Sequence, residues 1–201
     1  MVAQTEDRAR RYSVEEWRAL LASSAVKYEY HDGQVVAMAG GTFDHSTIAL
    51  NVCGLLSTAL EGTPCRVYNS DMAVRLAQAE YRLPDATVTC DERDRGRGRE
   101  IQSPCVVVEV LSDSTEAADR TTKFELCRAC PSVQEYVLVA TAYQAVEVYR
   151  RAEPRWTFES YGPGGTVALE SLDVRLAVDQ LYRLTDVPLP GSAAPAQESP
   201  G

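Results

Sequence analysis

The chain has 201 residues, with 20 Lys and Arg against 29 Asp and Glu, so its formal net charge is −9. A hydrophobic fraction of 45% supports a folded core and argues against global disorder. No apolar run approaches the ~18 residues of a membrane span, and the N-terminus lacks the apolar stretch of a secretory signal, so we expect a cytoplasmic protein. The acidic composition alone points away from proteins that coat nucleic acid through bulk positive charge.

The N-terminal part carries clear local signals. Residues 1–11 are polar, and we expect them to be disordered. Ser13 followed by Glu16 forms a capping box, which predicts a helix that runs to about Ser23. Asp32-Gly33 lies between two stretches that alternate apolar and polar residues, which predicts a hairpin with a type I′ turn.

The middle of the chain changes from a helical pattern to a strand pattern. Apolar residues recur at helical spacing from His45 to Leu60, and the predicted helix ends before Gly62. Strands are then predicted over residues 65–76, around a turn at Asn69-Ser70, and within residues 81–91, beginning near Pro84-Asp85. A further strand is predicted over residues 105–112. The last of these is an almost continuous apolar run, which is typical of a central strand covered on both faces.

The remaining elements are one long helix, several strands and a short final helix. A helix is predicted over residues 116–130, a buried strand over 135–140, an antiparallel meander over 145–151, 155–161 and 166–172, and a short helix near 178–184. Residues 186–201 are rich in Pro, Ala, Ser and Gly, and we expect a disordered tail. The whole order predicts a mixed α/β (α+β) fold, with a single domain over residues 12–185.

The chain contains six cysteines. Without a secretory signal they are predicted to be reduced thiols, most of them small core residues. Cys127 and Cys130 form a C-x-x-C pair, but no second pair or histidine cluster completes a zinc site.

Two carboxylates interrupt strands that are otherwise apolar. Glu109 lies within Val106–Leu111, and Asp85 directly follows Pro84 at the start of an apolar strand. A lone buried carboxylate costs several kcal/mol unless it is paired, protonated or bound to a cation. On neighbouring strands the two would supply oxygen ligands to a hard divalent cation, most naturally Mg²⁺ or Mn²⁺.

The chain has only two lysines, and one of them, Lys123, follows these carboxylates within the next predicted helix. A lysine near a metal-bound water can orient that water and offset charge that develops on a phosphate. The plainer alternative is that Asp85 ends a turn and that Glu109 reaches solvent or pairs with an arginine.

At this point the chain resembles a known group of proteins. The motifs are Pro84-Asp85, VVVEVLS at 106–112, Lys123 in the next helix, QEYVLV at 134–139, YEYHDGQVVAM at 28–38, His45 and VEVYRR at 146–151. They resemble the PD-(D/E)XK nuclease superfamily and, more closely, its Uma-type restriction endonuclease family of bacteria, over roughly Tyr12–Leu184. The resemblance implies a restriction-endonuclease-like core, a central mixed sheet flanked by helices with an N-terminal hairpin and a C-terminal antiparallel extension. It also implies Mg²⁺-dependent hydrolysis of DNA phosphodiester bonds and a homodimer.

The chain departs from the pattern of these families at three positions. The superfamily's lysine two residues after the acidic position is Leu111 here, so Lys123 must take its role from the helix. The family's tyrosine one turn after that lysine is Cys127, and the aspartate that often ends the next strand is Ala140.

Four further residues are candidates for supporting roles. Glu29, which the resemblance places near the cleft, either holds a second metal through water or is an ordinary exposed strand residue. His45 either contacts phosphate or water, or is a capping or surface residue. Ser112 and Ser114 suit a phosphate at a helix start, although N-capping also explains them.

The first hypothesis is therefore a DNA endonuclease. Asp85, Glu109 and the carbonyl of Val110 would hold the metal, and Lys123 would orient the attacking water, with Glu29 and His45 in support. The second is a catalytically degenerate module of the same fold that binds a partner or nucleic acid without cutting, and the third is a hydrolase that acts on nucleotides or RNA. Residues 12–185 alone hold 17 basic and 25 acidic residues, so DNA binding should be weak and dependent on metal and salt.

Overall fold

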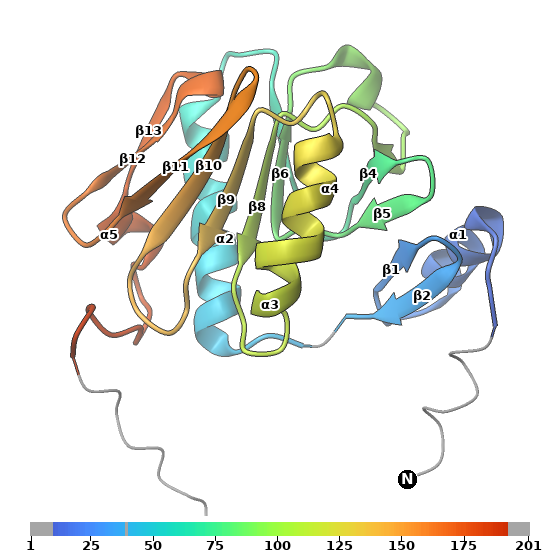
Figure 1. Cartoon of the computed structure of the whole chain (residues 1–201), viewed down its shortest axis with the longest axis horizontal. Coiled ribbons are helices and arrows are strands. Elements are labelled where there is room, and N and C mark those ends of the chain that lie inside the picture. The colour runs from blue at the N-terminus through green and yellow to red at the C-terminus, as the bar shows by residue number, and fades with distance from the viewer. Residues whose placement is uncertain (1–9, 39, 193–201) are drawn as a thin grey trace, which may run out of the picture.

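The computed structural model describes residues 10–38 and 40–192, which form three β-sheets with helices packed around them (Figure 1). The helices are α1 (Val14–Ser23), α2 (Phe43–Ala59), α3 (Glu116–Ala118), α4 (Phe124–Ala129) and α5 (Val178–Leu181). The strands are β1 (Tyr28–His31), β2 (Gln34–Ala37), β3 (Arg66–Asn69), β4 (Ala73–Ala77), β5 (Glu80–Arg82), β6 (Ala86–Thr89), β7 (Glu100–Ile101), β8 (Val106–Val110), β9 (Glu135–Val139), β10 (Val146–Ala152), β11 (Arg155–Tyr161), β12 (Thr166–Leu169) and β13 (Val174–Ala177).

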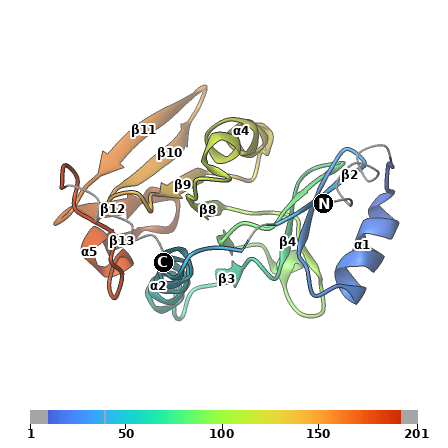
Figure 2. The same cartoon turned by 90° about the horizontal axis from the view of Figure 1, so that it is seen from below.

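A six-stranded sheet in the order β11-β10-β9-β8-β6-β3 forms the centre of the fold. Strands β8 and β9 are parallel and the other neighbours are antiparallel. A parallel pair needs a crossover connection, and α3 and α4 supply it. Helix α2 covers one face of the sheet and α4 the other (Figure 2).

Strand β8 packs against a hydrophobic cluster on each face, so a charged residue within it is unusual. Val106, Val108 and Val110 pack into the cluster that contains α2, whereas Val107 packs with α4. Because side chains alternate along a strand, Glu109 lies on the same face as Val107, beneath α3 and α4. The prediction of a central strand covered on both faces is confirmed.

The N-terminal strands belong to the second sheet, whose order is β2-β1-β5-β4-β7. The predicted capping box is present, since the Ser13 hydroxyl accepts a hydrogen bond from the Glu16 N–H at 3.1 Å. Helix α1 buries Trp17 completely against this sheet. Asp32 and Gly33 both have positive φ, 41° and 87°, as a type I′ turn requires.

Two predicted elements differ from the structure. The helix expected over residues 116–130 is interrupted by a π-helical turn over Asp119–Lys123, which places an extra residue between α3 and α4. The expected meander is also wrong in its third strand, because β12 pairs with β13 in a separate two-stranded sheet. The chain reverses there at Asp173, which adopts the left-handed conformation.

The predicted start of the C-terminal tail is too early. Val187 is buried, and Gln144 donates hydrogen bonds to the carbonyls of Val187 and Pro188. Ordered chain therefore continues past residue 185. Residues 1–9 and 193–201, which hold most of both predicted disordered segments, lie outside the described residues.

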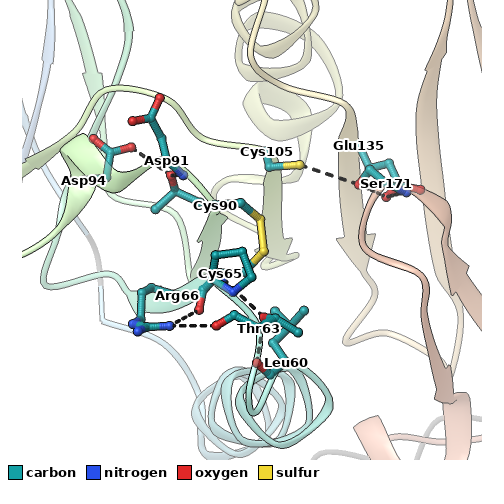
Figure 3. Close-up of a disulfide and its surroundings, with 12 residues drawn as sticks. Leu60, Thr63, Cys65, Arg66, Cys90, Asp91, Asp94, Cys105, Glu135 and Ser171 are labelled. Atoms are coloured by element: carbon teal, nitrogen blue, oxygen red, sulfur yellow. Dashed lines mark hydrogen bonds between the residues drawn. A yellow bond between two sulfur atoms is a disulfide. The ribbon is translucent and has the colours of Figure 1, made fainter.

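The prediction that all cysteines are reduced is wrong for one pair, because Cys65 and Cys90 form a disulfide (Figure 3). The β3–β6 register pairs Arg66 with Thr89, so the two cysteines face each other one residue beyond the ladder. That register cannot be read from sequence spacing. Cys53, Cys105, Cys127 and Cys130 are free thiols.

Replacing both Cys65 and Cys90 by alanine should lower the free energy of unfolding by about 3 kcal/mol, because a bridge across a loop of about 25 residues restricts the unfolded chain. Urea denaturation of the two proteins, each with and without a reductant, measures the difference. The reductant should lower the wild-type midpoint to that of the variant. Equal midpoints for the oxidised proteins would contradict the prediction.

Candidate active site

Asp85 and Glu109 lie next to each other on adjacent strands. The antiparallel register pairs Ala86 with Val108, so Asp85, one residue before β6, stands opposite Glu109 on β8. Both side chains are largely buried, with 12% of Asp85 and 5% of Glu109 exposed. Glu109 therefore neither reaches solvent nor pairs with an arginine.

The partner of Glu109 is Lys123, whose side chain descends from the π-helical turn. Its Nζ lies 3.1 Å from Glu109 Oε1, 2.9 Å from Asp119 Oδ1 and 3.6 Å from Glu29 Oε1. One ammonium group thus faces three carboxylates that come from β8, the π-helical turn and β1. The lysine side chain is itself only 11% exposed.

Burial and charge act in opposite directions on this cluster. Burial is the largest influence on Glu109 and raises its pKa, while the nearby Lys123 ammonium opposes that change. Burial disfavours the charge on Lys123, but Glu109, Glu29 and Asp119 more than offset it and raise the pKa of the lysine. The lysine therefore remains a cation that the three surrounding carboxyl groups stabilise.

Asp119 is a site residue that the sequence reasoning missed. It is 1% exposed, and its backbone carbonyl accepts a hydrogen bond from the Tyr136 hydroxyl at 2.9 Å. The signal was its position four residues before Lys123, a spacing that brings oppositely charged side chains together on a helix. The π-helical turn retains that contact, and the same Lys123 ammonium also reaches Glu109.

Asp85 is held by groups from two elements. Its Oδ2 accepts a hydrogen bond from the Val110 N–H at 2.8 Å and lies 3.4 Å from His45 Nε2. The contact with Asp85 raises the pKa of His45, against the opposing effect of burial. Gly41 is required beside the ring, because a Cβ there would lie 2.7 Å from His45 Nδ1.

Glu29 is an ordered, largely buried residue rather than an exposed strand glutamate. Its Oε1 accepts a hydrogen bond from the Leu83 N–H at 3.2 Å, and its Oε2 lies 3.7 Å from the buried Arg82 guanidinium. These contacts fix the carboxylate that faces Lys123.

Ser112 and Ser114 lie on the loop that follows β8. Their hydroxyls are 3.1 Å apart, and that of Ser112 is also 2.9 Å from the Thr115 hydroxyl. The N-cap of α3 is Thr115, whose side chain makes no capping hydrogen bond, and the Glu116 N–H donates to the Ser112 backbone carbonyl. The serine hydroxyls therefore do not act as helix caps.

The structure brings all eight predicted site residues to one cavity of about 290 Å³. They are Glu29, His45, Asp85, Glu109, Val110, Ser112, Ser114 and Lys123. By contrast, Cys127 is buried in the hydrophobic cluster beneath α4 with Leu111 and Ala140. The three departures from the family pattern thus pack in the core and do not line the cavity.

The donor set of this cavity suits a hard cation. Across the described ranges, 10–38 and 40–192, no three His, Cys, Asp or Glu side chains converge as a complete metal cage. Mg²⁺ needs no such cage, because it is commonly held by one or two carboxylates together with waters and substrate phosphates. Asp85 and Glu109 meet that requirement.

A mixed sheet flanked by helices, with these carboxylates and a lysine at one end, defines a restriction-endonuclease-like fold. The model of the Uma2 family, described as "Putative restriction endonuclease", matches residues 14–179. The chain belongs to this family.

The chain is also similar to individual proteins of cyanobacteria. The "Uncharacterized protein slr1290" of Synechocystis sp. is 40% identical over 159 residues, covering 78% of this chain and 84% of that protein. A second Synechocystis protein, sll1609, is 29% identical over 132 residues, covering 64% and 75%. A crystal structure from Anabaena variabilis, described as "a putative nuclease belonging to DUF820", has the same fold, with a TM-score of 0.71, 18% identity and coverage of 85% of this chain and 97% of that one.

In the part of this chain that the structure describes, no helix is both long and apolar enough to span a membrane.

Replacing Lys123 by methionine should lower the free energy of unfolding by about 3 kcal/mol, because buried carboxylates lose their cation. Adding Glu109→Gln should recover part of that loss, since the second change removes one of the uncompensated charges. A double-mutant cycle by urea denaturation measures the coupling. Additive losses in the double variant would show that the two side chains do not interact.

Proposed function

We propose that the protein is a metal-dependent endonuclease that hydrolyses DNA phosphodiester bonds. The observation that carries the proposal is the placement of Asp85 and Glu109 opposite each other on adjacent strands, with the Lys123 ammonium 3.1 Å from Glu109. Membership of the Uma2 family and the fold of the Anabaena structure support it.

Asp85, Glu109 and the carbonyl of Val110 would hold Mg²⁺ or Mn²⁺. When bound, such an ion lowers the pKa of a coordinated water and withdraws charge from a phosphate oxygen. The roles of the protein groups follow from their positions. Lys123 orients the attacking water and offsets negative charge on the phosphate, and Glu29 holds the ammonium in place.

The remaining residues would position the acidic pair and the DNA. His45 fixes the carboxylate of Asp85 through its 3.4 Å contact. Ser112 and Ser114 offer hydroxyl donors to a phosphate at the edge of the cavity. Since two cuts in a duplex are commonly made by paired subunits, the active form would be a homodimer.

The acidity of the chain limits how DNA binds in this proposal. The formal net charge is −9, and three carboxylates surround a single lysine in the cavity. A divalent cation must therefore neutralise part of the cavity before a phosphate approaches. Binding at this site would be weak, dependent on metal and sensitive to salt.

One observation favours a second candidate, a degenerate nuclease-fold module that binds a partner or nucleic acid without cutting. The Lys123 ammonium is engaged by Asp119 and Glu29 as well as by Glu109, which leaves it less free to contact water or phosphate. Metal binding and cleavage separate the two candidates.

Cleavage of plasmid and single-stranded DNA should require Mg²⁺ or Mn²⁺ and should fall at least about a hundredfold in Asp85→Asn, Glu109→Gln and Lys123→Ala. Gel assays with purified proteins measure it, and circular dichroism verifies that each variant is folded. Lys27→Ala, which alters the other lysine of the chain, is the matched control and should cleave normally.

Cleavage that persists in all three variants would refute the assignment of the site. If no variant and no wild-type protein cleaves DNA, isothermal titration with Mn²⁺ shows whether the metal site is present. If the wild type binds Mn²⁺, loses that binding in Asp85→Asn and Glu109→Gln, and never cuts, the degenerate module is the correct description.

A further inference from the structure

A second pocket shares no lining residue with the acidic cavity. It has a volume of about 580 Å³ and is lined by α4 and by the β10–β11 hairpin. Four aromatic rings line it, those of Phe124, Tyr149, Trp156 and Phe158. The nuclease chemistry proposed above uses none of these rings.

The rings form a connected surface that ends in an exposed side chain. The β10–β11 register pairs Tyr149 with Phe158, whose ring centroids are 5.1 Å apart. Phe124 extends this contact from the helix, with its centroid 4.6 Å from that of Tyr149. Phe158 is 55% exposed, so the ring is available to a planar ligand without rearrangement of the core.

Arginines supply the charge of this pocket. Arg151 lies 4.7 Å over the Trp156 ring and donates hydrogen bonds to three backbone carbonyls, which fixes its guanidinium. Arg128 and Arg155 also line the pocket, and Arg155 is exposed. Glu125 lies 2.6 Å from Arg128 and Glu153 lies 3.7 Å from Arg151, so these two arginines are already paired with carboxylates. Among the described residues that line the pocket, Arg155 is the arginine that forms no ion pair.

We propose that this aromatic–arginine pocket binds single-stranded DNA, with a base stacked on Phe158 and a phosphate held by Arg155. The proposal rests on the proposed function and extends it to a second contact with the substrate. Exposed aromatic rings beside basic side chains bind single strands with little sequence preference, because every base has a π-face. The bases of a duplex are already stacked on one another, so the pocket should favour single strands.

The pocket is structurally linked to the acidic cavity. Phe124 directly follows Lys123. The Phe124 ring packs in the aromatic cluster, whereas the Lys123 ammonium contacts Glu109. A strand held in the pocket would thus lie along the helix that carries the proposed catalytic lysine. Because Phe158 and Arg155 lie outside the acidic cavity, binding at this pocket should be independent of metal.

Fluorescence anisotropy with a labelled dT12 oligonucleotide in EDTA at low salt tests the proposal. Phe158→Ala should weaken binding about tenfold, as expected for the loss of one stacked base. Arg155→Ala should weaken binding severalfold and reduce its salt dependence. Tyr143→Ala and Arg75→Ala, an exposed aromatic residue and an exposed arginine outside the pocket, should bind as the wild type does.

Wild-type affinity in Phe158→Ala, tighter binding of duplex than of dT12, or no binding at all would each overturn the proposal. A change of oligomeric state in Phe158→Ala, seen by sedimentation without a change in dT12 binding, would assign the pocket to a second copy of the chain. Cleavage in Mg²⁺ reports on the other site separately. If the protein cleaves DNA but its dT12 binding does not depend on Phe158, only the proposal for the pocket is refuted. If dT12 binding depends on Phe158 but no DNA is cleaved, only the proposed nuclease function is refuted.

Discussion

The interaction on which the site depends is a buried ammonium group shared by three carboxylates. Without Lys123, the carboxyl groups of Glu109 and Asp119 would stand nearly solvent-free and uncompensated, at a cost of several kcal/mol. Without the carboxylates, burial would lower the pKa of the lysine and disfavour its charge. This mutual requirement holds the connection between β8 and β9 against the sheet and the N-terminal hairpin beside it.

The fold supplies the geometry through two backbone features. The antiparallel β6–β8 register sets Asp85 opposite Glu109, and the parallel β8–β9 pair requires a crossover, which brings a helical segment over the same strand. The π-helical turn in that crossover then directs Asp119 and Lys123 toward Glu109. Both faces of β8 are covered by helices, so the cluster is largely buried and opens to solvent only through the cavity.

Much of this arrangement could be predicted from sequence because polar residues in apolar runs are costly. Glu109 within an apolar strand and Asp85 after Pro84 indicated the site, and Asp32-Gly33 predicted the hairpin turn through its conformational preference. The predictions that were wrong concerned contacts that depend on how the strands pair in the folded protein. The Cys65–Cys90 bridge follows from the β3–β6 pairing, and β12 pairs with β13 because of a reversal at Asp173. Asp119 could have been found from its position four residues before Lys123, but that spacing alone does not show that both side chains are buried beside Glu109.

We propose that this end of the sheet is a divalent-metal site that supports phosphodiester hydrolysis. Anomalous diffraction from crystals soaked in Mn²⁺ tests it most directly, because the signal locates the ion without reference to activity. The account predicts one strong peak between the carboxylates of Asp85 and Glu109, within bonding distance of the Val110 carbonyl. Manganese bound only elsewhere, or none at millimolar concentration with both carboxylates ordered, would contradict it.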